Sequence, residues 1–155
     1  MTHIFKNLIL ILLLPFCFTT VTAQTPVTRA ETLVGVWEMD AHSMISNMEE
    51  PERFDFESMS EFPRIRFLEN LASRKFTFDA SGDFTARWEA HGKHLSTQGR
   101  WIWNKEGELQ ITSPTGASIY LVSFPSDGRM VLEPLGRTQG MLKVLYFNFI
   151  ESGDR

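Results

Sequence analysis

Between residues 75 and 150, apolar and polar side chains alternate in short runs, as they do in β-strands that bury one face. The clearest run covers residues 83–91, where Phe84, Ala86 and Trp88 share one face and charged or hydroxyl side chains occupy most of the other. Glycine-bearing turns follow one another at intervals of about 9–15 residues, a spacing typical of antiparallel sandwiches and barrels. The pattern predicts seven consecutive antiparallel strands, with turn glycines at positions 82, 92, 107, 116 and 128.

The turns are of two kinds. Four of them place two residues before the glycine, which suits a three-residue loop whose last residue has a positive φ. The fifth, at residues 91–94, predicts a two-residue turn formed by Gly92 and Lys93. His91 and His94 would then lie opposite each other across the hairpin. Two imidazoles are too few ligands for a zinc or copper site, so we predict no metal here.

An eighth strand is predicted at residues 33–39, and an insertion of different character at residues 40–73 separates it from the other seven. Eight acidic residues and a single arginine lie between positions 38 and 61, which predicts an acidic loop. Apolar residues then recur every three or four positions over 62–72, which predicts one short amphipathic helix. The insertion is either a lid over a bound molecule or a structural cover for the barrel. A third interpretation is an acidic loop that binds a partner.

Five short motifs carry a family resemblance: Gly35-Val36-Trp37, residues 76–84, Gly99-Arg100-Trp101, residues 109–111 and residues 130–132. In this order they resemble the lipocalin (calycin) superfamily, and are most similar to small exported lipocalin-like domain proteins of Gram-negative bacteria. The resemblance implies an all-β fold, an eight-stranded antiparallel up-and-down barrel over residues 33–151, with one short helical insertion between strands 1 and 2.

The same resemblance implies that Trp37, two residues after Gly35, closes one end of the barrel. A basic residue near the last strand, either Arg137 or Lys143, would pack across it. The alternative is that Trp37 is an ordinary core residue.

An eight-stranded barrel either packs solid or holds one small ligand. Its inward faces would be rich in aromatic side chains, which could line an apolar cavity or fill it. The candidate lining residues are Phe76, Phe78, Phe84, Trp88, Trp101, Trp103 and Tyr120.

The first 23 residues resemble a cleavable signal peptide, with Lys6 in a weakly positive head, an apolar run and a cut predicted after Ala23. The apolar run is too short to span a bilayer, so no membrane span is expected after processing. Residues 24–32 form a polar lead-in, and residues 152–155 a tail. The processed chain has no cysteine and a net charge of −5, since removing Lys6 leaves 14 basic residues against 19 acidic ones. These features favour a periplasmic or secreted protein without disulfides and argue against nucleic-acid binding.

No phosphate-binding loop, nucleophile elbow or catalytic triad can be recognised, so we predict no catalytic residue, no metal and no cofactor. The leading hypothesis is non-covalent binding of a small, largely apolar molecule inside the barrel. One alternative is a solid-cored interaction module, acting as a homodimer through the late strands or with an envelope partner, because the strands after residue 118 are apolar on both faces. Another is an enzyme without a motif, for which Arg100, Glu89 and Tyr120 are the nearest buried polar candidates.

Overall fold

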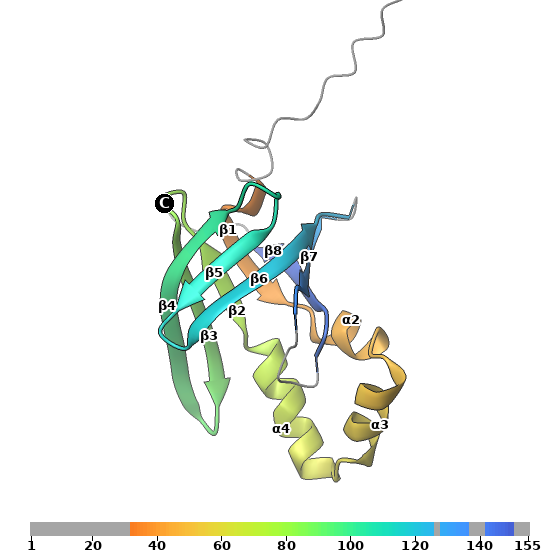
Figure 1. The fold of residues 1–155 in the computed structure, drawn as a ribbon. Helices are drawn as coiled ribbons and strands as arrows, with labels where there is room; N and C mark the ends of the chain where they lie inside the picture. The colour runs from red at the N-terminus through yellow and green to blue at the C-terminus, as the bar shows by residue number, and fades with distance from the viewer. Residues whose placement is uncertain (1–31, 126–127, 137–141, 151–155) are drawn as a thin grey trace, which may run out of the picture.

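The computed structural model describes residues 32–125, 128–136 and 142–150, so the predicted signal peptide, the tail and Arg137 lie outside it, as does the lead-in up to residue 31. Within these ranges the chain forms eight strands (Figure 1). They are β1 (Gly35–Met39), β2 (Lys75–Phe78), β3 (Asp83–Ala90), β4 (Lys93–Trp103), β5 (Leu109–Ser113), β6 (Gly116–Ser123), β7 (Arg129–Pro134) and β8 (Leu145–Ile150).

The strands close into one barrel. Each strand pairs antiparallel with the next along the chain, and β1 pairs with β8, where Trp37 lies opposite Phe149. The predicted fold class, an eight-stranded antiparallel up-and-down barrel, is confirmed. Closure removes the free edges that an open sheet would expose to other chains.

The insertion between β1 and β2 is more helical than the sequence pattern predicts. It contains α2 (Ala41–Ser46), α3 (Glu50–Ser58) and α4 (Glu61–Ala72), so the expectation of an acidic loop with a single helix is wrong in its first part. Pro51 lies in the first turn of α3, where its missing N–H has no intrahelical partner to lose. Across the described residues no helix is long and apolar enough to cross a membrane.

The insertion helices are held by caps and by a few buried side chains. The Asp40 carboxylate accepts a hydrogen bond from the Ser43 backbone N–H at 2.9 Å and so caps α2. Met44 and Leu71 are both 2% exposed and belong to the same core cluster as the inward residues of the strands. The short helices therefore form by packing against the barrel.

Trp37 belongs to the buried core and is 3% exposed, and its role in closing one end of the barrel stays a prediction. Its indole Nε1 donates to the Leu33 carbonyl oxygen at 2.8 Å, and the Phe149 ring meets it edge-on with 5.0 Å between centroids. The Phe149 ring also occupies the space that a Cβ on Gly35 would need, and Gly35 has a φ of 141°, so this close approach requires glycine. Lys143, one of the two basic candidates for packing on Trp37, forms ion pairs with Glu49 and Glu52.

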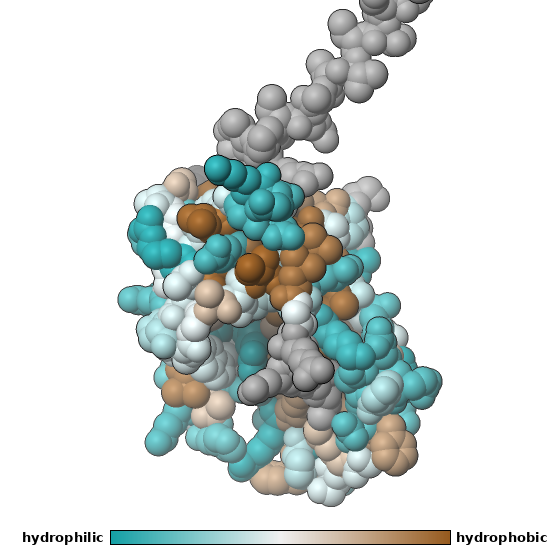
Figure 2. All heavy atoms as spheres, in the orientation of Figure 1, coloured by the Kyte–Doolittle hydropathy of each residue, from teal (hydrophilic) through white to brown (hydrophobic). Residues whose placement is uncertain are grey.

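The outer face of the late strands is partly covered. Met130, Val131 and Leu132 are all buried, so both faces of β7 are covered there, and α2 packs against β8. α4 packs against β3, β1 and α2. Ile102, Leu121 and Leu135 are 55%, 46% and 42% exposed. Figure 2 shows apolar atoms gathered on the upper part of the face that carries β4, β5 and β6.

Candidate functional site

Four of the seven candidate lining residues pack against one another inside the barrel. The Phe78 ring lies 5.2 Å from the Phe84 ring and 6.0 Å from the Trp101 ring, measured between centroids. The Phe76 ring lies 5.2 Å from Phe84 and 4.8 Å from Phe147. In this part of the barrel the rings pack closely against one another, as in a solid core.

The other three candidates are partly buried and pack against the core to which this cluster belongs. Trp103 and Tyr120 lie opposite Leu109 on its two neighbouring strands, and the Trp103 indole nitrogen is buried without a hydrogen-bond partner in the described residues. Trp88 is half-buried near the end of β3, with the Arg74 guanidinium 5.9 Å from its ring. Burial lowers the pKa of Arg74 from its ordinary value.

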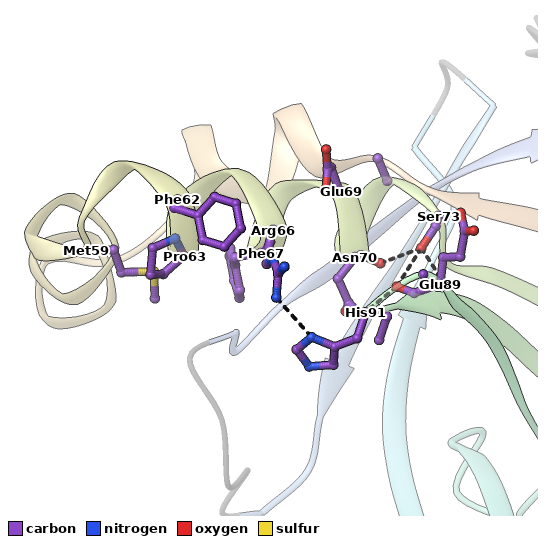
Figure 3. A pocket seen from close by; sticks show the side chains of 13 residues that line it. Met59, Phe62, Pro63, Arg66, Phe67, Glu69, Asn70, Ser73, Glu89 and His91 are labelled. Carbon is purple, nitrogen blue, oxygen red and sulfur yellow. Dashed lines mark hydrogen bonds between the residues drawn. The ribbon is translucent and has the colours of Figure 1, made fainter.

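A large cleft lies outside the aromatic cluster, between α4 and the tip of the β3–β4 hairpin. It has a volume of about 1170 Å³, just above the usual range for small-molecule sites. Figure 3 shows α4 along one side and the hairpin residues near its far end. The lining residues are Met59, Phe62, Pro63, Arg66, Phe67, Glu69, Asn70, Ala72, Ser73, Glu89, Ala90, His91 and Gly92.

The base of the cleft forms because the hairpin extends beyond its neighbour. The pairing of β2 with β3 runs no further than Lys75 opposite Arg87, so the last residues of β3 have no strand beside them there. Side chains of the α4 end take that place. Asn70 Nδ2 donates to the Glu89 carbonyl oxygen at 2.9 Å, and the Glu89 N–H donates to Ser73 Oγ at 2.9 Å. The helix is thereby fixed to the hairpin through backbone groups that need partners.

The tip of the hairpin differs from its predicted form by one residue. Ala90 pairs with Lys93, and His91 and Gly92 form the turn with φ angles of 54° and 68°, so the turn is not centred on Gly92 and Lys93. Positive φ at both central residues is the type I′ pattern. His94 therefore pairs with Glu89 and not with His91, and no group of three or more potential metal ligands occurs among the described residues.

The shifted turn brings His91 to α4. Arg66 Nη1 lies 3.2 Å from His91 Nδ1, which joins the helix to the hairpin tip across 25 residues of sequence. Because a guanidinium can only donate, Nδ1 accepts in this contact. The Arg66 guanidinium also lies over the Phe62 ring, 4.3 Å from its centroid. Two contacts of different kinds thus hold the Arg66 side chain at the cleft wall.

A second cavity of about 620 Å³ adjoins the first and shares Ala72, Ser73 and Glu89 with it. Its wall includes Trp88 and Leu95. A third cavity of about 40 Å³ lies beside Glu52 and Lys143 and has room for about one water molecule. Within the described ranges, Trp88 is the one candidate lining residue that borders any of these three cavities. The ligand-binding role of all seven candidates stays a prediction.

The polar candidates for a motif-less enzyme do not meet inside the barrel. Arg100 is exposed and forms an ion pair with Asp83 at 2.6 Å, and Glu89 is exposed, 3.8 Å from His94. Tyr120 is half-buried on the inner face of β6, opposite Leu109. The three residues therefore do not form one buried polar group.

Comparison with known proteins gives a fold-level likeness. A crystal structure of a DUF4847 family protein from Bacteroides vulgatus is similar with a TM-score of 0.48 and 14% sequence identity, and the match covers 81% of this chain and 99% of that chain. No family model and no curated protein matches the chain.

The residues at the cleft were not recognised as a site from the sequence. Phe62 and Arg66 were visible only as members of an amphipathic helix, and His91 only as part of a turn. Two features together indicate this site. The β3–β4 hairpin is longer than the neighbouring strand β2, and the adjacent helix carries exposed aromatic side chains.

Proposed function

We propose that this chain is an exported, lipocalin-like protein that binds a small, largely apolar molecule without a covalent bond. The binding place we favour is the cleft between α4 and the β3–β4 hairpin. The observation that carries this proposal is a volume of about 1170 Å³ with Met59, Phe62 and Phe67 on its helix side. Ligand sites are concave and combine apolar side chains with polar groups, and seven of the thirteen residues of this wall are apolar.

The lid and cover hypotheses for the insertion apply to different faces of α4. Leu71 is 2% exposed in the core, so that face covers the barrel. Phe62 is 62% exposed and lines the cleft, so that face is available to a ligand. Covering part of an exposed phenylalanine ring stabilises a complex by roughly 25 cal/mol per Å².

The test compares two exposed phenylalanines of the insertion. Phe62 lines the cleft, whereas Phe54 is 71% exposed on α3 and does not. We expect Phe62→Ala to weaken the binding of 1-dodecanol, a neutral apolar probe, by about fivefold, which is about 1 kcal/mol. Phe54→Ala should leave the affinity unchanged. Isothermal titration calorimetry measures both. Absence of saturable binding to the wild-type protein, or equal effects of the two substitutions, would exclude the cleft as the site.

A second candidate function is a homodimer through the outer face of the late strands. The exposed side chains of Leu121 on β6 and Leu135 just after β7 favour it, because exposed apolar groups gather at interaction surfaces. Sedimentation velocity of the wild-type protein and of Leu121→Lys tests it. A dimer that the substitution dissociates supports this function, and a wild-type monomer at high concentration excludes it.

A further inference from the structure

The Arg66 guanidinium is a cation held in place at an apolar wall. It is fixed by the Phe62 ring below it and by His91 at the hairpin tip. Among residues 32–125, 128–136 and 142–150, no carboxylate lies within ion-pair distance of Arg66. A guanidinium has five N–H donors in a planar fork, and the contact with His91 occupies one nitrogen.

The other polar groups of the cleft are already engaged or turned away. Asn70 and Ser73 bind the backbone of Glu89, and the Glu89 carboxylate lies 3.8 Å from His94. Figure 3 shows Glu69 on the side of α4 opposite His91 and Arg66 directed toward the hairpin. The unpaired charge that faces the cleft is therefore the positive one.

We propose that the cleft takes an amphipathic molecule whose head is a single carboxylate, with Arg66 binding the head and Phe62, Phe67 and Met59 contacting the apolar body. This inference rests on the proposed function, since it specifies the ligand of the same cleft. Arginine pairs with carboxylates through two parallel hydrogen bonds, and holding the fork in advance reduces the entropy lost on binding.

The single cation at the wall favours a monoanion over a more highly charged head. A dianionic phosphate would lose more hydration than a carboxylate on entering the cleft, and Arg66 is the one lysine or arginine among the described lining residues that could compensate for that loss. Gly92 and Ala90 at the hairpin tip are small, and a Cβ placed on Gly92 would meet nothing within 4 Å. The approach to Arg66 is therefore open.

The experiment compares three probes that share a twelve-carbon chain and differ in the head: dodecanoate, 1-dodecanol and dodecyl phosphate, each below its micelle concentration. Titration calorimetry of the full-length protein should give about tenfold tighter binding of dodecanoate than of the alcohol, the equivalent of about 1.4 kcal/mol. The phosphate should bind more weakly than the carboxylate.

Two substitutions on α4 locate the effect. Arg66→Gln should bring the ratio of the two affinities, carboxylate over alcohol, close to one while leaving the alcohol affinity nearly unchanged. Arg64→Gln removes the same charge from the same helix at a position that does not line the cleft, and should leave the ratio near its wild-type value. Circular dichroism checks that both variants are folded.

The outcomes separate this inference from the proposed function. If the alcohol binds as well as the carboxylate, or if the preference for the carboxylate survives Arg66→Gln, the cleft is a binding site but the head-group assignment is wrong. Tighter binding of the phosphate would also overturn the assignment. If no probe binds, the proposed function fails together with the inference.

Discussion

Replacing Phe78 by alanine distinguishes a filled barrel from a hollow one. The Phe78 side chain is 1% exposed, and its ring contacts Phe76, Phe84 and Trp101 at centroid distances of 5.2–6.4 Å. Removing a buried phenylalanine side chain loses about 1.5–3 kcal/mol of transfer free energy. In a close-packed interior the cavity left behind raises the total to about 3–5 kcal/mol.

A residue that lined an existing pocket would cost less. One side of its ring would already face empty space, so its removal would enlarge a cavity without creating one, and we expect a loss below about 2 kcal/mol in that case. From the mutual packing of the rings we predict the larger loss.

Urea unfolding followed by far-UV circular dichroism measures the change in unfolding free energy. Phe54→Ala, at a 71% exposed ring, is the control and should change it by less than about 0.5 kcal/mol. A loss below about 2 kcal/mol for Phe78→Ala, with an unchanged m-value, would contradict the close packing described above and return the interior to consideration as the ligand site.

Two further predictions concern how the insertion is held. Hydrogen bonds with Lys143 lower the pKa of Glu52 from 4.5, and hydrogen bonds with Glu49 and Glu52 raise the pKa of Lys143 from 10.5. Lys143→Met should therefore lower the urea midpoint at neutral pH. The difference from wild type should shrink as the pH falls below 4.5, because Glu52 is protonated first in the unfolded chain. A difference that persists at about pH 3 would argue against this ion pair. Ser73→Ala removes the acceptor of the Glu89 N–H, so amide hydrogen exchange at Glu89 should accelerate, with about 1 kcal/mol lost; unchanged exchange would mean that Ser73 does not hold the hairpin.

The strands of the barrel could be predicted because each strand and turn depends on residues that are close together in the sequence. Alternation along residues 83–90 sets which side chains face inward, and the glycine at position 82 adopts the positive φ that its turn requires. Closure of the barrel was expected from the family resemblance and not from the alternation. In the structure β1 pairs with β8, and the half-exposed Phe149 ring packs edge-on against the buried Trp37.

The cleft could not be predicted because it depends on how the hairpin tip and α4 lie relative to each other. A one-residue shift of the turn decides whether His91 faces His94 or reaches Arg66, and the sequence Ala90-His91-Gly92-Lys93 is compatible with both. The helices α2 and α3 were missed because the acidic composition of residues 38–61 was interpreted as a sign of a loop, whereas glutamate suits the first turn of a helix, as Glu50 and Glu52 show in α3.

The position of the cleft follows from unequal strand lengths. β2 has 4 residues, whereas β3 has 8 and β4 has 11, so the β3–β4 hairpin extends beyond its neighbour and leaves backbone groups of Glu89 to be satisfied. α4 satisfies them with Asn70 and Ser73, and this contact places the aromatic and basic side chains of its first two turns beside the hairpin tip. Leu71, on another face of α4, packs into the barrel core, whereas the cleft residues Phe62 and Arg66 do not belong to that core. Exposed side chains on one face of α4 can therefore change ligand preference while the packing of the barrel, and its stability, remain as they are.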